Sequence, residues 1–393
     1  MPSEYEGAVG RGIGIGSIPG MPEGDVSKPL RLLILEGDGI GPEITRATVE
    51  VLNAADRLFG LNIEYQRAGI GFDALKAEGT TFPLRTLELA RACDSVVLGP
   101  VSHNEYPPVA EGGLNPSGEL RKHLDLFANI RPAFTREAVP YPSRVPFDLV
   151  IVRENTEGFY ADRSMFAGPG EYMPTPDIAL STRKVTRAAS ERIAEEAFRL
   201  ARLRRNKVTA VHKANVLRLS DGLFLGVVRE VARRFPEVAY EEQLVDAMAA
   251  LLVRDASQFD VVVATNMFGD ILSDEASELA GSLGLGASLN LGKDHAVAQA
   301  QHGSAPSIAG QDLANPYALI ASGAMMLDWL GSRRQRSDML SAAKLIRHAL
   351  DSAIDDPTTR TRDLGGTLGT KAFTQVLIDR MRSSCASKPN TVG

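Results

Sequence analysis

Short runs of apolar residues recur along this chain and alternate with longer segments of helical periodicity. Such short runs are typical of strands that are buried on both faces, as in parallel sheets. In the segments between them, apolar residues such as Ile193, Ala197 and Leu200 fall on one face of a helix. The alternation predicts an α/β fold with parallel strand pairs. The predicted strands are residues 32–35, 96–98, 149–152, 208–211 and 261–263.

Length and composition are those of an ordinary globular protein. With 393 residues, 44% of them hydrophobic, the chain is long enough for two domains. It contains no apolar run near the roughly 18 residues of a membrane span and no secretory signal, so we expect a cytoplasmic protein without a membrane partner. The formal charge of −6 argues against a nucleic-acid surface. Two cysteines, Cys93 and Cys385, suggest neither a disulfide framework nor a zinc cluster.

Glycine, proline and polar residues mark the segments that we expect to be irregular. Residues 1–29 are rich in Gly, Pro and Ser, so a flexible N-terminal extension is expected, and residues 383–393 are expected to fray. Residues 168–176 are expected to form a loop that is long enough to be an arm reaching a partner subunit. The basic cluster 202–207 is expected to be a solvated helix end.

Two carboxylates lie four residues apart in the segment 268–275, directly after a predicted strand. If a helix begins near Gly269, Asp270 and Asp274 lie one turn apart on one face, within reach of a single hard cation. Two adjacent carboxylates repel each other, whereas a divalent ion turns that repulsion into attraction. The alternative is an acidic first turn that the helix dipole stabilises.

The segment 37–43 (GDGIGPE) follows a strand and precedes a helical pattern. It resembles a dinucleotide-binding fingerprint, but the position of the third glycine is occupied by Pro42. Pro42 and Glu43 suit the first turn of a helix. We therefore expect no Rossmann pyrophosphate site in this segment. The alternative to any binding role is that the segment only forms a tight turn between strand and helix.

Three arginines stand beside predicted elements: Arg121, Arg131 and Arg153. Guanidinium groups bind carboxylates in a bidentate manner, and Arg153 at the end of a buried strand needs an anionic partner. Together with the carboxylate pair they indicate a small anionic substrate, although each alone could be a structural ion pair.

Two residues are candidates for proton transfer. Lys213 follows the strand at 208–211, where partial desolvation would lower its pKa, and Tyr160 lies a few residues beyond another strand. A surface lysine and a half-buried tyrosine are the alternatives. Asp246, flanked by apolar residues, is a plausible third metal ligand. The segment 302–306 offers backbone donors and little side-chain bulk, which suits a loop around a nucleotide.

Taken together and in this order, the motifs resemble those of the β-decarboxylating dehydrogenase family, which contains isocitrate, 3-isopropylmalate, homoisocitrate, tartrate and D-malate dehydrogenases. The resemblance covers about residues 30–380. The motifs are 37–43, 120–132, 152–160, 213–215, 245–248, 266–274 and 302–316.

The resemblance implies an α/β, isocitrate/isopropylmalate dehydrogenase-like fold of two domains that is not a Rossmann fold. Residues 30–126 and 281–393 would form a large domain with the nucleotide loop, and residues 127–280 a small domain with the dimer interface. It also implies a homodimer in which Lys213 and Asp246 act in the neighbouring subunit's site.

The resemblance further implies the roles of individual residues. Tyr160 and Lys213 would transfer protons, and the three arginines would bind the carboxylates of a (2R)-malate. Asp246, Asp270 and Asp274 would hold Mg²⁺ or Mn²⁺. The residues that would contact NAD or NADP are Asn215, His302, Gly303, Ser304, Ala305, Pro306, Ser307 and Asn315.

Departures from the family pattern concern cofactor and substrate choice. Ser307 stands where NAD-using relatives commonly have an acid, and Gln299 where a glutamate is usual; NAD is favoured because no cation for a 2′-phosphate is evident. Asn115 and Ser117 lie where the substituent at C3 would bind, and they favour a polar or carboxylated one. We therefore expect an isocitrate-like substrate, with 3-isopropylmalate (leucine biosynthesis), homoisocitrate, tartrate and D-malate as alternatives. A regulatory subunit is the non-enzymatic alternative.

Overall fold

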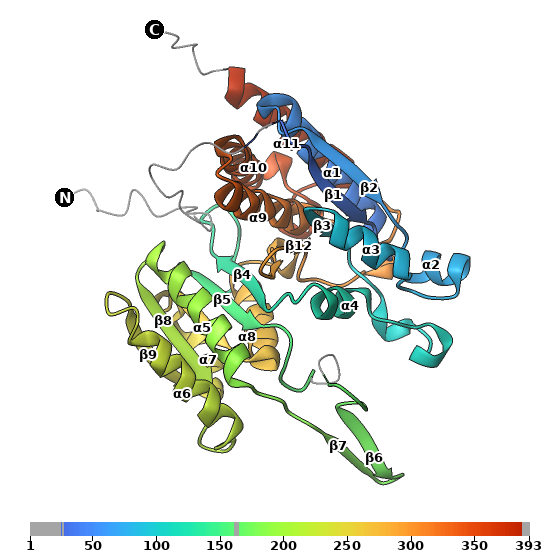
Figure 1. Ribbon diagram of the computed structural model, residues 1–393. Helices are drawn as coiled ribbons and strands as arrows, with labels where there is room; N and C mark the ends of the chain where they lie inside the picture. Colours follow the sequence, from blue (N-terminus) through green and yellow to red (C-terminus); the bar gives the residue numbers. More distant parts are fainter. Residues whose placement is uncertain (1–24, 26, 161–164, 387–393) are drawn as a thin grey trace, which may run out of the picture.

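A large mixed sheet runs through the computed structural model, which describes residues 25, 27–160 and 165–386. Within these residues the sheet has ten strands (Figure 1). Their order is β2 (Ile63–Arg67), β1 (Leu30–Leu35), β3 (Ser95–Leu98), β12 (Ala296–Gln299), β11 (Leu289–Leu291), β4 (Ala128–Phe134), β5 (Asp148–Glu154), β10 (Val261–Ala264), β8 (Lys207–His212) and β9 (Ala239–Leu244).

The strands predicted from sequence are all present as β1, β3, β5, β8 and β10, and the α/β class is confirmed. The pairs β1–β3, β5–β10 and β8–β10 are parallel, as expected. The centre of the sheet, whose strands β4, β11 and β12 were not predicted, is antiparallel: β11 pairs with β12 and β4, and β4 pairs with β5. Residues 292–295, which join β11 to β12, are too few for the crossover that a parallel pair requires.

The helices gather in two groups on the sheet. Helices α1 (Gly41–Phe59), α9 (Tyr317–Arg334), α10 (Ser337–Asp355) and α11 (Thr370–Ala386) lie at the half with β1 and β3 (Figure 1). Helices α5 (Arg187–Arg202), α6 (Ser220–Ala232), α7 (Val245–Asp255) and α8 (Asn266–Leu279) lie around β5, β8 and β10. The shorter helices are α2 (Gly71–Glu78), α3 (Leu84–Ala92) and α4 (Pro116–His123).

Burial follows the sequence pattern. Helix α5 buries Ile193, Ala197 and Leu200 on the predicted face. Across the residues described, no helix is both long enough and apolar enough to cross a bilayer.

We retain the division into two domains as a proposal, and its boundary then falls between β11 and β4, within the continuous sheet.

Helix α8 begins at Asn266 rather than near Gly269, because β10 ends at Ala264 and the chain turns into the helix at Thr265. Asp270 therefore lies in the second turn, and the first turn contains no acidic residue. The alternative of an acidic first turn stabilised by the helix dipole is thus wrong. Asp270 and Asp274 still lie one turn apart.

The loop expected at 168–176 is instead part of a hairpin, formed by β6 (Glu171–Thr175) and β7 (Ile178–Ser181). Proline is tolerated there because both strands are edges of a two-stranded sheet. The hairpin extends away from the rest of the chain (Figure 1), and it exposes the side chains of Tyr172, Met173, Ile178 and Leu180.

Other expectations concern the ends and the basic cluster. Residues 1–24 and 26 of the expected extension, and 387–393 of the expected frayed end, lie outside the described residues. Ser383 is not frayed, since α11 continues to Ala386. In the cluster 202–207, Arg204 is not solvated: its side chain is 5% exposed and pairs with Asp148 and Asp260, because it closes the amino ends of β5 and β10.

Candidate active site

The carboxylate pair of α8 lies against two arginines from neighbouring strands. Nη1 of Arg131 in β4 is 3.1 Å from Oδ1 of Asp270 and 3.4 Å from Oδ1 of Asp274. Arg153 in β5 forms an ion pair with the same Oδ1 of Asp270. The fold thus brings together four residues that sequence reasoning selected from three separate segments.

Close packing of α8 on β5 allows this contact. A Cβ atom on Gly269 would lie 2.8 Å from both Cβ and Cγ of Arg153, so the helix approaches the arginine only because position 269 is glycine. Arg153 is 2% exposed, and Oδ1 of Asn266 accepts hydrogen bonds from its Nε at 3.0 Å and its Nη2 at 2.6 Å.

Asn266 is one of three supporting residues that sequence reasoning missed. The others hold Arg131: Oδ1 of Asn129 accepts from its Nε at 2.6 Å, and Oγ of Ser273 accepts from its Nη1 at 2.7 Å. The spacing offered one signal, since Ser273 is three residues after Asp270 on the same helix. The role of Asn129, two residues before Arg131 on the same strand face, could have been inferred from strand periodicity.

The two carboxylates have different electrostatic surroundings. Burial raises the pKa of Asp270, but the positive charges of Arg153, Arg131 and Arg121 outweigh burial and hold this pKa below its usual range. The pKa of Asp274 is raised by burial, and the nearby Asp270 adds to this effect. Since both Oδ1 atoms face one guanidinium nitrogen, their geometry suits a shared cation, and their oxygen donors suit Mg²⁺ or Mn²⁺.

Tyr160 also belongs to the cluster around Asp270. Its hydroxyl donates to Oδ2 of Asp270 at 3.2 Å, and the guanidinium carbon of Arg153 lies 5.7 Å from the centre of its ring. A phenol group therefore stands next to the carboxylate and the arginines. Arg121, at the end of α4, contributes charge to the same carboxylate.

Lys213 and Asp246 lie together in a different place. Nζ of Lys213 is 2.5 Å from Oδ1 of Asp246, whose side chain is 63% exposed. Throughout the part of the chain that the structure describes, no three His, Cys, Asp or Glu side chains gather as metal ligands, so Asp246 does not join the carboxylate pair within one chain.

The segment before Arg121 presents its polar side chains through helix α4. Oδ1 of Asn115 caps the helix by accepting from the backbone N–H of Gly118 at 3.2 Å. The hydroxyl of Ser117 donates to Oε1 of Gln299 at 3.0 Å. Gln299 thus connects β12 to α4.

The expected nucleotide loop packs against the turn at 37–43. The carbonyl of Ser304 accepts from the N–H of Ile40 at 2.8 Å, and a Cβ on Gly39 would lie 2.0 Å from that carbonyl oxygen. The tight-turn alternative for 37–43 is therefore confirmed. Ser304 is buried and its hydroxyl lies 2.7 Å from that of Ser102. The exposed residues of the loop are Gly303, Ala305, Pro306 and Ser307.

The remaining cofactor candidates differ in their surroundings. Oδ1 of Asn315 accepts from the N–H of Tyr317 and its Nδ2 donates to Asp363, so both ends of this amide are engaged within the fold. Part of His302 is exposed to solvent, although burial of its ring lowers the pKa of the imidazole. Asn215 is exposed, beyond β8 and close in sequence to Lys213.

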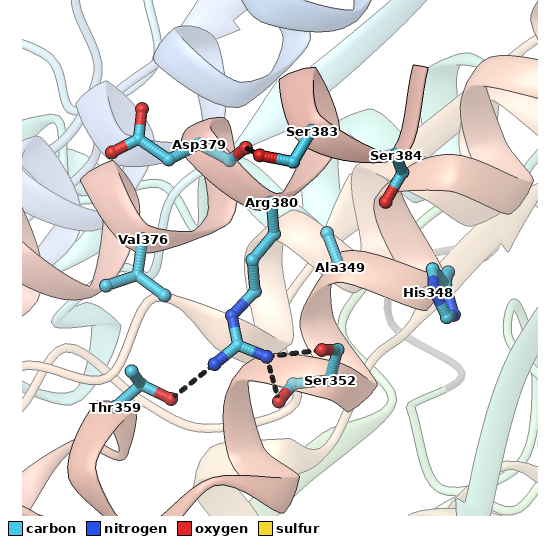
Figure 2. Close-up of a pocket in the computed structure, with 9 residues that line it drawn as sticks. All are labelled: His348, Ala349, Ser352, Thr359, Val376, Asp379, Arg380, Ser383 and Ser384. Atoms are coloured by element: carbon cyan, nitrogen blue, oxygen red, sulfur yellow. Dashed lines mark hydrogen bonds between the residues drawn. The ribbon is translucent and has the colours of Figure 1, made fainter. Parts of the chain in front are cut away.

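A separate hollow lies between α10 and α11, lined by Arg380, Ser352, Thr359 and His348 among others (Figure 2). The guanidinium of Arg380 donates to the hydroxyl of Thr359 at 3.1 Å and to Ser352. Because its charge is directed into these contacts, and the hollow contains none of the residues above, the candidate active site is the cluster around Asp270.

Known proteins resemble this chain along nearly its whole length. The family model described as isocitrate/isopropylmalate dehydrogenase matches residues 31–381. The isocitrate/homoisocitrate dehydrogenase of Thermus thermophilus is 42% identical over 356 residues, which are 90% of this chain and 99% of that protein. A 3-isopropylmalate dehydrogenase of Methanothermobacter thermautotrophicus is 39% identical over 346 residues, 87% and 96% of the two chains. The crystal structure of isocitrate dehydrogenase from Methylococcus capsulatus has a TM-score of 0.80 at 39% identity, covering 90% and 99%.

Proposed function

This chain belongs to the isocitrate/isopropylmalate dehydrogenase family, and we propose that it oxidatively decarboxylates a (2R)-malate with a polar substituent at C3, isocitrate being favoured. Members of the family are oxidoreductases that bind small anionic substrates and act on a CH–OH group. The substrate, the site residues and the oligomeric state are the proposed parts.

One observation carries the proposal: Arg131 and Arg153 both contact Asp270, and Asp274 lies one helical turn away. Two buried guanidinium groups can bind the substrate's carboxylates in a bidentate manner. The acids beside them can hold a divalent cation at the substrate's oxygens. Arg121 would be the third carboxylate-binding residue, since its charge already acts on Asp270.

Proton transfer requires a base for the substrate's hydroxyl and an acid for the carbon that loses CO₂. We assign the first role to Lys213 and the second to Tyr160, whose hydroxyl stands 3.2 Å from Asp270. Nζ of Lys213, in its uncharged form, would take the hydroxyl proton, and the hydroxyl of Tyr160 would give a proton to C3. The hydride of C2 would pass to the bound cofactor, and the carboxylate on C3 would leave as CO₂. The products are a 2-oxo acid, CO₂ and reduced cofactor.

Family membership implies NAD and a divalent metal ion as cofactors. We propose Mg²⁺ or Mn²⁺ because the available donors are carboxylate oxygens, and NAD rather than NADP because no cation for a 2′-phosphate is evident in the loop 302–307. The metal, when bound, supplies charge stabilisation for the substrate's developing oxyanion. NAD supplies the hydride acceptor.

Asn115 and Ser117 support a polar substituent at C3. An isopropyl group could form no hydrogen bond with these side chains, whereas a polar substituent could, so the polar one gains affinity. The name of the Thermus relative, isocitrate/homoisocitrate dehydrogenase, agrees with this choice. The alternative is 3-isopropylmalate, which the name of the Methanothermobacter relative supports.

We also propose that the active form is a homodimer. Lys213 and Asp246 form an exposed pair apart from the Asp270 cluster, so their use in catalysis requires a second chain. The hairpin β6–β7 and its exposed apolar side chains suit a contact between subunits. A regulatory subunit is disfavoured because the arginines, the acids, Lys213 and Tyr160 are all present.

Initial rates of NADH and NADPH formation test the proposal. Isocitrate, 3-isopropylmalate, homoisocitrate, tartrate and D-malate are compared in the presence of Mn²⁺. We expect the highest kcat/KM with isocitrate and NAD. A preference for 3-isopropylmalate would refute the substrate assignment alone, whereas turnover of none of the five would refute the enzymatic proposal.

A further inference from the structure

We propose that the buried ion pair between Arg183 and Asp221 is a positioning pair for Lys213, and that it links Lys213 to the hairpin and to helix α8. The inference rests on the proton-transfer role proposed for Lys213. It goes beyond that role by naming two residues that touch neither substrate nor cofactor and yet determine where the base stands.

Asp221 holds the backbone of Lys213. It lies in the first turn of α6 with no exposed surface, and it pairs with Arg183, whose side chain is 8% exposed. Oδ2 of Asp221 accepts the backbone N–H of Lys213 at 2.6 Å. The carbonyl of Lys213 in turn accepts the N–H of Leu217 at 2.8 Å. Both peptide groups of Lys213 are therefore held by hydrogen bonds, so the Cα atom that carries its side chain has a fixed position.

Arg183 connects three further elements. It stands two residues after the end of β7, at one base of the hairpin. Its Nη1 donates to Oγ of Ser220 at 2.8 Å, and its Nη2 to Oγ1 of Thr265 at 3.0 Å. Thr265 is the residue directly before helix α8. One guanidinium group, which stands just after the hairpin in the chain, thus contacts the start of α6 and the residue before α8.

The rings of two phenylalanines enclose this guanidinium. The guanidinium carbon lies 5.7 Å from the ring centre of Phe159 and 5.4 Å from that of Phe268. Phe268 is in α8, two residues before Asp270, and Phe159 precedes Tyr160. A displacement of Arg183 would therefore reach both the acids of the chain's own site and the lysine that we assign to the partner's site.

A contribution to stability does not account for this pair. Burying two charges costs free energy that their attraction only about returns, so two apolar side chains could fill the space equally well. Unlike two apolar side chains, an ion pair forms directional hydrogen bonds, and each donor or acceptor fixes the position of a particular atom. The atoms fixed here are the N–H of Lys213 and the hydroxyl of Thr265.

The chain contains a matched pair that lacks these links. Arg204 and Asp260 are equally buried, and Asp260 also accepts a backbone N–H, that of Arg205, at 2.8 Å. This pair lies at the amino ends of β8 and β10, whereas Arg183 and Asp221 lie at their carboxyl ends. It therefore serves as a control for the loss of a buried ion pair as such.

The test compares Arg183→Met/Asp221→Leu with Arg204→Met/Asp260→Leu, in each of which both partners of the buried pair are removed together. In the control, Asp148 loses its contact with Arg204 but keeps Arg205 as a partner at 3.8 Å. Thermal unfolding and size-exclusion chromatography establish that both variants are folded and have the wild-type oligomeric state. We expect kcat of the first variant to fall about 10- to 100-fold with KM changed less than about threefold, and kcat of the control to stay within about twofold. Asp221→Asn, which keeps an oxygen for the N–H of Lys213, should retain more of kcat than Asp221→Leu.

Hydrogen exchange gives a second readout that needs no activity. Exchange in a peptide covering residues 212–217 should accelerate in the first variant and stay unchanged in the control. A folded first variant with wild-type kcat and wild-type exchange would overturn the inference. Should it fail to fold, wild-type kcat and exchange in Asp221→Leu, or equal losses of kcat in Asp221→Asn and Asp221→Leu, would do the same. If the wild type turns over no substrate, the proposed function fails, while the exchange of residues 212–217 still decides whether the pair holds Lys213.

Discussion

The side chain of Arg153 occupies the space that a Cβ atom on Gly269 would need. This relationship ties the helix that carries the two acids to the strand that carries the arginine. It also explains a glycine in a helix interior, where glycine ordinarily costs about 1 kcal/mol relative to alanine.

Gly269→Ala should therefore weaken substrate binding. The added Cβ would lie 2.8 Å from two carbons of Arg153, so either the guanidinium or helix α8 must shift. Overpacking of this kind costs about 1–3 kcal/mol, which exceeds the gain in helix propensity. We expect a lower midpoint of thermal unfolding and kcat/KM reduced about 10- to 100-fold.

Gly226→Ala in α6 is the matched control. A Cβ there meets no atom within 4 Å, so only the gain in helix propensity remains. The free energy of unfolding should rise by about 0.5–1 kcal/mol with unchanged kcat/KM. Equal stabilisation by the two substitutions would show that Arg153 does not constrain position 269.

Loss of either acid should remove metal binding while the fold remains. Asp270→Asn and Asp274→Asn keep the side-chain shape but remove one charged ligand of the proposed cation. Binding of Mn²⁺, measured by electron paramagnetic resonance, should weaken at least about 10-fold, and metal-dependent turnover should be lost. Circular dichroism should be unchanged. Turnover equal to that of the wild type across a Mn²⁺ titration would remove both residues from the site.

The fold class and the strands β1, β3, β5, β8 and β10 could be predicted because buried strands and amphipathic helices leave local patterns. The centre of the sheet could not, because pairing direction depends on connection length and on neighbours distant in sequence. Helix α8 begins three residues before the predicted start for a related reason: Thr265 and Asn266 look like loop residues until the end of β10 is known.

The candidate site shows the same division. Charged residues such as Asp270 and Arg153 were predictable, because their side chains are costly to bury without a partner or a ligand. The uncharged residues that hold the two arginines were not predictable. Asn129, Asn266 and Ser273 accept hydrogen bonds from the arginines only because the strands and α8 are packed together. The link from Arg183 to Lys213 joins residues thirty positions apart through Asp221, and no local pattern encodes it.

Glu154 should give the protein a measurable pH dependence of stability. Its buried carboxylate accepts hydrogen bonds from the N–H groups of Thr156 at 2.7 Å and Glu157 at 2.9 Å, yet burial outweighs them and raises its pKa above the ordinary 4.5. Between 4.5 and the raised pKa, the folded state binds a proton that the unfolded state has released. The stability contributed by this group therefore falls as pH rises through that window.

Glu154→Gln removes this titration. The difference in free energy of unfolding, wild type minus variant, should fall as pH rises from 4.5 and then level off above the raised pKa. Urea unfolding at a series of pH values measures it. A difference that is constant, or that increases with pH, would contradict a raised pKa for Glu154.

Ser117→Ala should reveal which substituent the site prefers. The Ser117 hydroxyl donates to Gln299, so the variant loses a polar atom beside the expected substituent without adding volume. Asn115 is a poorer probe, because its loss would also uncap α4 at a cost of about 1 kcal/mol. If the substituent at C3 is polar, kcat/KM for isocitrate should fall about 10-fold relative to that for 3-isopropylmalate, since a lost hydrogen bond costs roughly 1–1.5 kcal/mol. The ratio of the two kcat/KM values, measured for wild type and variant, cancels any general loss of activity. A ratio that stays constant would show that the Ser117 hydroxyl only joins α4 to Gln299 and does not contact the substituent, which would then be recognised by other residues.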